Sequence, residues 1–272
     1  MTRIIPTYDD YPQIGRLRLD PSLALANSDP ILIRRGLVTG ASIVHKFGRN
    51  PDVPNGTWEG VLQAAAQFPW LTAASAVRIR SGGNGADTGN GAGARTVTIQ
   101  GIDATGVEIT ETVTTAGAAA SSPTTALFLR VYRAWVATAG TYTGANTAAV
   151  IIETTGGTAL VQITAGEGQT QFCGYTIPLG KTGYLASVMV QADAAKAADF
   201  RLFTRADCTT VTAPFQAKRL KFFWDGVLGQ VEVKPFTPML RIPALTDIWI
   251  EARGGGAGTE VSADMEIIIF DD

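Results

Sequence analysis

The chain has 272 residues and a mass of 28.6 kDa, a size that suits one large or two modest domains. A formal net charge of −2 and a pI near 5.5 argue against a protein that binds nucleic acid by neutralising phosphates. The two cysteines, Cys173 and Cys208, and the single histidine, His45, exclude a Cys/His zinc site and a disulfide-dense scaffold.

Residues 1–60 are rich in prolines, each of which fixes φ and lacks an amide donor. Short apolar pieces and six arginines lie between these prolines, so the segment is too apolar for a purely solvated tail. An extended segment cannot bury enough apolar surface against itself to offset its lost backbone entropy. We therefore predict an extended N-terminal arm over residues 1–60, lying across its own body or another subunit.

No apolar run in the chain approaches the roughly 20 residues of a membrane helix. The first residues, Met1–Pro6, also lack the basic and apolar regions of a signal peptide. We expect no membrane partner and a protein that stays where it is made.

Residues 61–168 show the pattern of short strands and turns. Polar and apolar residues alternate in Thr96–Gln100 and again in Val107–Thr110, and a glycine-containing turn between them predicts a hairpin. Further strands are predicted at Leu127–Val136, Ala149–Ile152 and Leu160–Thr164. This span is therefore predicted to form one β-rich module, with its boundary near Gly166–Gln171.

Residues 169–272 continue the same pattern and predict a second β module. Its strands are expected near Phe172–Ile177, Tyr184–Gln191, Phe200–Thr204, Ala217–Trp224, Gln230–Phe236, Asp247–Ala252 and Met265–Phe270. Many short strands at near-regular spacing indicate a sandwich or a barrel. Helical candidates are Trp58–Phe68 and Tyr184–Phe200, the latter open between helix and strand because its valines favour a strand and its alanines a helix.

Three glycine-containing motifs carry formal matches to ligand sites. Gly82–Asn90 matches the start of a calcium-binding nonapeptide, but it occurs once and has Gly89 where a large apolar residue is needed. Gly89–Ala94 matches a dinucleotide fingerprint but precedes a strand rather than a helix. Gly174–Thr182 resembles a P-loop with one residue too many and with Pro178 in place of an amide donor. We interpret these segments as a mobile glycine-rich loop and a tight turn.

Catalytic constellations have no positive support in the sequence. Any Ser/His/Asp or Cys/His catalyst would need His45, and no nucleophile elbow accompanies it. The cysteines fall on or beside apolar strands and are expected to be small buried hydrophobes. Carboxylate pairs such as Glu108 with Glu111 are not placed across a cleft by the sequence. We expect no enzyme, no cofactor and no metal; a polysaccharide hydrolase is the third-ranked class.

Stretches from about residue 40 to residue 272 point to a known group of proteins. They are Ile43–Asp52, Gly93–Gly101, Ile109–Val113, Pro178–Thr182, Asp247–Ala252 and Val261–Ala263. In these stretches the chain resembles virion structural proteins of tailed bacteriophages. The resemblance implies a non-catalytic particle component, located in the virion and made in the host cytoplasm, and it assigns no binding residue.

The resemblance and the strand pattern together imply an all-β fold in which residues 169–272 form a jelly-roll-like sandwich. We predict a capsid decoration (cement) protein that assembles as a homo-oligomer, a trimer, and binds the major capsid protein or other virion subunits. Its arm would pair arginines with an acidic capsid surface and place aliphatic side chains in grooves. The residues expected to do so are Arg16, Arg18, Arg34, Arg35, Ile31 and Ile33.

The alternative is a tail or head fibre component, a receptor-binding adhesin. Such a protein would expose an aromatic-lined or loop-rich tip, and the glycine-rich loop 82–93 is the candidate for it. The stretch Lys218–Trp224 mixes basic and aromatic residues, but alternation on a half-exposed strand explains it as well as nucleic-acid binding does. We expect no nucleic-acid partner.

Overall fold

The computed structural model describes residues 30–63 and 67–272. In these ranges the chain is all-β, as predicted, with one short helix, α2 (Pro30–Arg34). The strands are β1 (Ala41–Val53), β2 (Glu59–Gly60), β3 (Ser75–Ser81), β4 (Ala94–Ile102), β5 (Glu108–Thr114), β6 (Leu127–Phe128), β7 (Arg130–Ala139), β8 (Val150–Thr154), β9 (Ala159–Ile163), β10 (Gly174–Thr176), β11 (Lys181–Ala192), β12 (Ala198–Arg205), β13 (Arg219–Val227), β14 (Val231–Ile242), β15 (Asp247–Gly254) and β16 (Thr259–Asp271).

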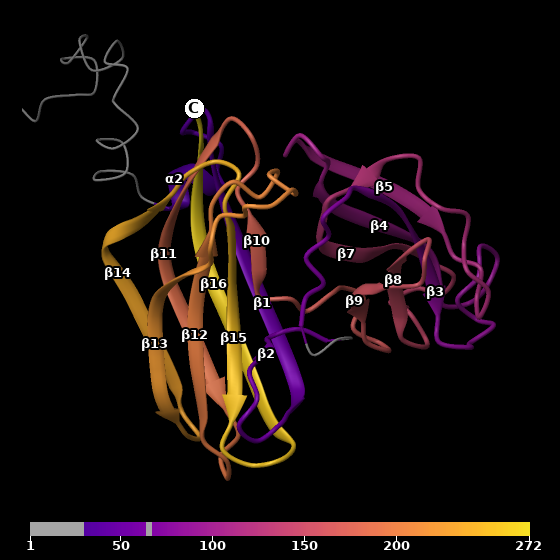
Figure 1. Cartoon of the computed structure of the whole chain (residues 1–272). Helices are drawn as coiled ribbons and strands as arrows, with labels where there is room; N and C mark the ends of the chain where they lie inside the picture. The colour runs from indigo at the N-terminus through magenta and orange to yellow at the C-terminus, as the bar shows by residue number, and fades with distance from the viewer. Residues whose placement is uncertain (1–29, 64–66) are drawn as a thin grey trace, which may run out of the picture.

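The larger of two β bodies is a sandwich of two antiparallel sheets (Figure 1). One sheet has the order β1-β16-β11-β14, and the other has the order β10-β15-β12-β13, with the short β2 also pairing with β15. If β1 and β10–β16 are numbered one to eight along the chain, the sheets read 1-8-3-6 and 2-7-4-5. This is the strand order of a jelly roll.

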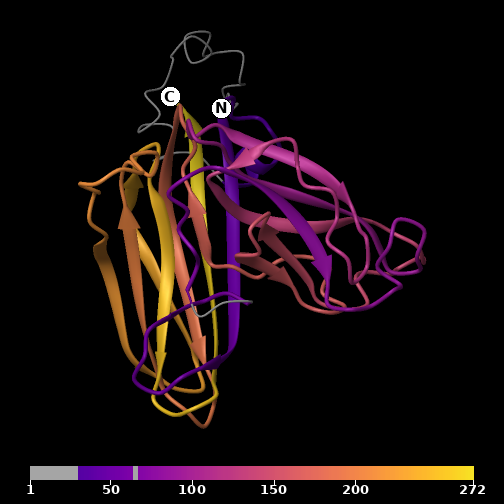
Figure 2. The same cartoon turned by 45° about the vertical axis from the view of Figure 1, so that its right-hand side comes forward.

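The smaller body is inserted between the first and second strands of the jelly roll. Its two sheets have the orders β6-β3-β8-β9 and β5-β4-β7. It lies on the β1 side of the jelly roll in both views (Figure 1 and Figure 2). Buried apolar side chains from both bodies belong to one continuous core, so the insertion is packed against the jelly roll rather than tethered to it.

The prediction of an extended arm over residues 1–60 is wrong for the described residues that follow α2. β1 pairs with β16 from Ala41 opposite Phe270 to Val53 opposite Thr259, so it is a long edge strand of the jelly roll. Pro51 is tolerated because it stands at an irregularity in the pairing of an edge strand. A Cβ at Gly48 would lie 2.1 Å from the Val61 carbonyl oxygen, so glycine permits the close approach of the following segment.

The module predicted over residues 169–272 is therefore incomplete as a jelly roll, because its first strand comes from residues 41–53. Both helical candidates are also corrected. In Trp58–Phe68 the described residues include the strand β2 and no helix, and residues 64–66 lie outside the described ranges. Tyr184–Phe200 forms β11 and the start of β12, because Val188 and Val190 are buried at alternate positions between the two sheets.

Candidate functional site

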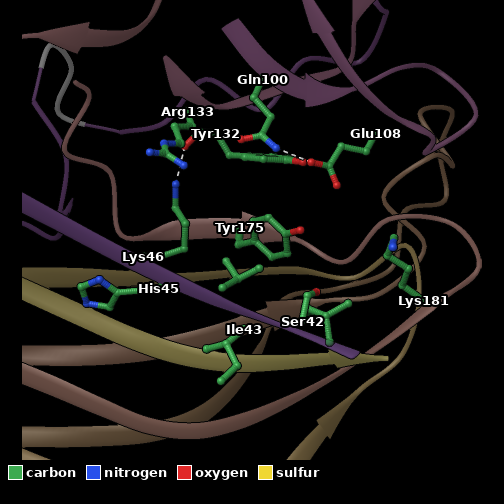
Figure 3. Close-up of a pocket in the computed structure, with 12 residues that line it drawn as sticks. Ser42, Ile43, His45, Lys46, Gln100, Glu108, Tyr132, Arg133, Tyr175 and Lys181 are labelled. Carbon is green, nitrogen blue, oxygen red and sulfur yellow. Dashed lines mark hydrogen bonds between the residues drawn. The ribbon is translucent and has the colours of Figure 1, made fainter. Parts of the chain in front are cut away.

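A crevice between the two bodies forms a cavity that several titratable side chains line (Figure 3). The cavity has a volume of about 240 Å³. From the jelly roll, the cavity is lined by His45 and Lys46 of β1 and by Tyr175 of β10. The inserted body contributes Tyr132 from β7 and Glu108 from β5, the latter bonded to the side chain of Gln100.

Lys46 crosses from the jelly roll to the inserted body. Its buried Nζ donates a hydrogen bond of 2.6 Å to the carbonyl oxygen of Tyr132. Burial lowers the pKa of Lys46 to about 7; the neighbouring Cys173 raises it and Arg133 lowers it further. Because its Nζ is already bonded to a backbone oxygen of the inserted body, Lys46 has a structural role and connects the two bodies.

Tyr132 and Tyr175 continue this junction, with ring centroids 4.7 Å apart in an edge-to-face arrangement. Burial raises the pKa of both hydroxyl groups above the ordinary tyrosine value. Both hydroxyls therefore stay protonated at neutral pH, and neither can serve as a base. The side chains in this crevice connect two packed bodies and do not form an acid–base pair.

A buried ion pair makes the second connection between the bodies. Arg130 of β7 and Asp247 of β15 are 2 % and 0 % exposed, and two N–O distances of 3.3 Å join them. Asp247 also accepts hydrogen bonds of 2.7 Å from Arg205 and from the Thr176 hydroxyl. Arg130 donates to the carbonyl oxygens of Leu71 and Leu129 as well. Both buried charges are thus paired and hydrogen-bonded.

The residues predicted to bind a partner through the arm are only partly available to do so. Arg16 and Arg18 lie outside the described residues. Ile33 is buried in a small cluster with Ile268 and Phe270 of β16, so its prediction as a groove-filling partner contact is wrong: its own sheet occupies it.

The other three arm residues lie together on or next to α2. Ile31 and Arg35 are exposed there. Arg34 extends toward Glu266 of β16 with an N–O distance of 3.5 Å, in an ion pair that is itself exposed. These side chains therefore remain near the C-terminal strand of their own chain, with exposed surface left for a partner.

The glycine-rich loop is organised around a carboxylate that the sequence analysis did not single out. Asp87 is fully buried and accepts hydrogen bonds from Ser81 and from the amides of Ala94, Thr147 and Ala148. Burial alone would raise the pKa of Asp87, but these hydrogen bonds hold it below the ordinary value. The interpretation as a mobile loop gives way to an ordered one around a fixed anion.

Other residues considered for catalysis or metal binding are dispersed. Cys173 and Cys208 are buried, as predicted, and burial raises the pKa of Cys208 to about 12. His45 lies beside the ring of Phe47, with centroids 5.8 Å apart. In the part of the chain that the structure describes, no group of three His, Cys, Asp or Glu side chains could hold a metal ion. Within the same ranges, no helix is long and apolar enough to cross a membrane.

β13 and β14 lie on the side of the jelly roll away from the inserted body (Figure 1). β13 pairs only with β12, and β14 pairs only with β11, so these two consecutive strands are the edges of the two sheets. Large apolar side chains there are between 36 and 58 % exposed. We define them as the open-side surface: Leu220, Phe223, Leu228, Val231, Val233 and Met239.

Sequence reasoning missed this surface, although a signal was present. A strand with one face in solvent has apolar residues only at every second position. β13 departs from this pattern, because apolar residues also stand at consecutive positions: Leu220, Phe222, Phe223 and Trp224. Phe222 and Trp224 pack inside the sandwich, with centroids 4.7 Å apart, whereas Leu220 and Phe223 are exposed. Phe223 lies beside Trp58, with ring centroids 6.1 Å apart, and keeps 40% of its surface exposed.

Comparison with known proteins gives no family. No protein-family model and no curated protein matches the chain. Among solved structures, the VP2 subviral particle of infectious bursal disease virus has 11% identity, 86% coverage of this chain, 68% coverage of its own chain and a TM-score of 0.23. The Gx strain of the same virus has 10% identity, coverages of 85% and 76% and a TM-score of 0.20. These scores are too low to establish a shared fold, and the jelly-roll assignment rests on the strand order alone.

Proposed function

We propose that this protein is a structural subunit of a virus particle, and specifically a capsid decoration protein of a tailed bacteriophage. Jelly rolls form the bodies of many capsid proteins and also of lectins, so the strand order by itself leaves the function open. The observation that carries the proposal is the open-side surface, which presents exposed apolar side chains on two edge strands. Large apolar side chains exposed on edge strands favour a protein–protein interface.

The chemistry of the open side indicates how a neighbour docks. Pro235 and Pro238 interrupt β14 and have no amide donor, so addition of a further strand along this edge is disfavoured. A partner would therefore pack through side chains. Arg219, Lys221 and Arg241 line a cavity of about 190 Å³ at the same side, and no carboxylate of the described ranges pairs with them. These cations favour an acidic partner surface.

In this proposal the jelly roll contacts neighbouring capsid subunits through the open side, and residues preceding β1 add a second attachment. One subunit that contacts two neighbours raises the free energy needed to separate them. A homo-oligomer, a trimer, would multiply these attachments, because linked binding sites gain effective concentration. No turnover is required of any residue in this mechanism.

The test is binding to particles that have been stripped of the protein. Val233→Glu places a charge in the open-side surface and should weaken particle binding at least about tenfold, the effect of roughly 1.4 kcal/mol. Tyr142→Glu is the matched control, because Tyr142 is 98 % exposed and lies in the inserted body. Equal occupancy for the wild type and Val233→Glu would contradict the proposal.

The second candidate function is a fibre component, a receptor-binding adhesin. An aromatic-lined cavity beside the junction of the two bodies, with Trp70 and Trp249 in its wall, favours it. The two functions differ in copy number, since cement proteins cover the capsid and fibres occupy few positions. Quantifying the band of this protein against the major capsid protein in purified particles distinguishes them.

A further inference from the structure

A third cavity lies apart from the crevice and next to the cavity at the open side, since Gln216 lines both. Its volume is about 430 Å³, within the range of small-molecule sites. Trp249 and Glu251 reach it from β15, on the opposite face from the core residues Ile248 and Ile250. Trp70, from the segment that leads into the inserted body, also lines it.

The floor of this cavity is aromatic. The ring centroids of Trp70 and Trp249 are 4.8 Å apart, and Phe68 meets Trp70 edge-on, also at 4.8 Å. Phe203 stacks against Trp249 with centroids 5.6 Å apart. These contacts fix the orientation of the two indoles before any ligand binds, which lowers the entropic cost of binding.

The polar groups around the floor are paired in charge but keep spare hydrogen-bonding capacity. Glu251 has a side chain only 5 % exposed, and its Oε1 accepts bonds of 2.9 Å from both Lys218 and the Trp249 indole N–H. Both donors use the same oxygen, which leaves Oε2 as an acceptor. Arg205 is bound to Asp247 at 2.7 Å. Gln216, also at the cavity, is exposed on the loop before β13.

Resident cations make this site unsuitable for a cationic ligand. The Arg205 guanidinium lies 5.4 Å from the centroid of Trp70, and Lys218 Nζ lies 6.0 Å from that of Trp249. The positions that a quaternary ammonium would take over the rings are thus partly occupied by the protein's own charges. Since each of these cations has a carboxylate partner, an anionic ligand gains little either.

We propose that this cavity binds a neutral saccharide. A hexose ring has an apolar C–H face that can lie against the half-buried Trp70, which the buried Trp249 supports from behind, and hydroxyls that both donate and accept hydrogen bonds. Glu251 Oε2 would accept from a hydroxyl, and Lys218 and the Gln216 amide would donate to others. The inference does not rest on the decoration role, and it agrees with the second candidate function, for which the same cavity is the supporting observation.

The experiment uses the full chain and three defined probes: maltohexaose, cellohexaose and chitohexaose. Intrinsic tryptophan fluorescence and calorimetry should show saturable binding of at least one of them. Glu251→Gln and Gln216→Ala should each weaken that binding by about tenfold, the value of one hydrogen bond. Trp135→Phe is the control, since Trp135 lies on β7 beside Arg133, away from the cavity, and should leave the affinity unchanged.

Gln216 is exposed, so Gln216→Ala stays folded and keeps the test decisive even if other variants do not. The proposal is overturned if none of the three oligosaccharides binds, or if binding is the same in Gln216→Ala and Glu251→Gln as in the wild type. Saturable quenching by tetramethylammonium chloride in place of the sugars would identify a cation cage and would also contradict it.

Discussion

Removing the buried carboxylate Asp247 tests whether the two bodies form one cooperative structure. Asp247→Ala takes away the acceptor for Arg130, Arg205 and Thr176 at once. Arg205 has a side chain 23% exposed and can turn toward water. Arg130 cannot, because it is enclosed at the junction, where its remaining partners are backbone carbonyl oxygens. The variant therefore leaves one uncompensated buried charge.

The magnitude follows from that single charge. Breaking a buried ion pair by removing one partner costs about 3–5 kcal/mol in free energy of unfolding. The exposed ion pair of Lys181 with Asp271, at 2.8 Å, provides the matched control, and Asp271→Ala should cost less than about 1 kcal/mol. In the double variant Arg130→Met with Asp247→Ala no charge is stranded, so its loss should be smaller than the sum of the two single losses.

The assay is urea unfolding followed by tryptophan fluorescence and by far-UV circular dichroism. Trp70 and Trp249 lie at the junction and report on it, while circular dichroism reports on both bodies. We expect coincident transitions in the wild type, because the two bodies share one core. A loss below about 1 kcal/mol in Asp247→Ala would refute the reasoning, as would strict additivity in the double variant.

Other substitutions test the junction and the loops separately. Lys46 has a pKa of about 7 in the folded chain against an ordinary value of 10.5, so folding disfavours its charged form and the unfolded chain binds the extra proton. Between pH 7 and 10 the stability of the wild type relative to Lys46→Met should rise by about 1.4 kcal/mol per pH unit in urea titrations, and parallel pH profiles would contradict this. Asp87→Ala should cost at least about 3 kcal/mol by thermal or urea unfolding, because three amides lose their acceptor; a loss under 1 kcal/mol would show that water replaces it. Gly101→Ala should destabilise by about 2 kcal/mol or more, since its Cβ would lie 1.8 Å from the Arg130 carbonyl oxygen, whereas Gly85→Ala meets nothing within 4 Å and should change stability by less than about 0.5 kcal/mol.

Local patterns were sufficient to predict most strands. Alternation in Thr96–Gln100 and Val107–Thr110 corresponds to β4 and β5, which pair antiparallel from Thr96 opposite Thr114 to Ile102 opposite Glu108. The hairpin could be predicted because both strands and their turn are adjacent in the sequence. The same holds for β11, where alternate burial follows the sequence pattern.

Long-range pairings were outside the reach of local patterns. β1 pairs with β16, more than two hundred residues later in the chain. Its residues Arg49 and Pro51 fitted the proline- and arginine-containing segment that was predicted to be an arm. The site residues were missed for the same reason: Trp70 and Glu251 are brought together only by the insertion of one body into the other. Asp87 was missed because its partners Thr147 and Ala148 lie on a distant turn.

The most direct test of the adhesion role is a cryo-EM reconstruction of the intact particle that contains this protein. We predict that β13 and β14 face a neighbouring subunit, with Val231 and Val233 covered and Arg219 or Arg241 near acidic side chains. If both strands face solvent while the subunit is held through its inserted body alone, the open side is no interface and the proposed mode of attachment is wrong.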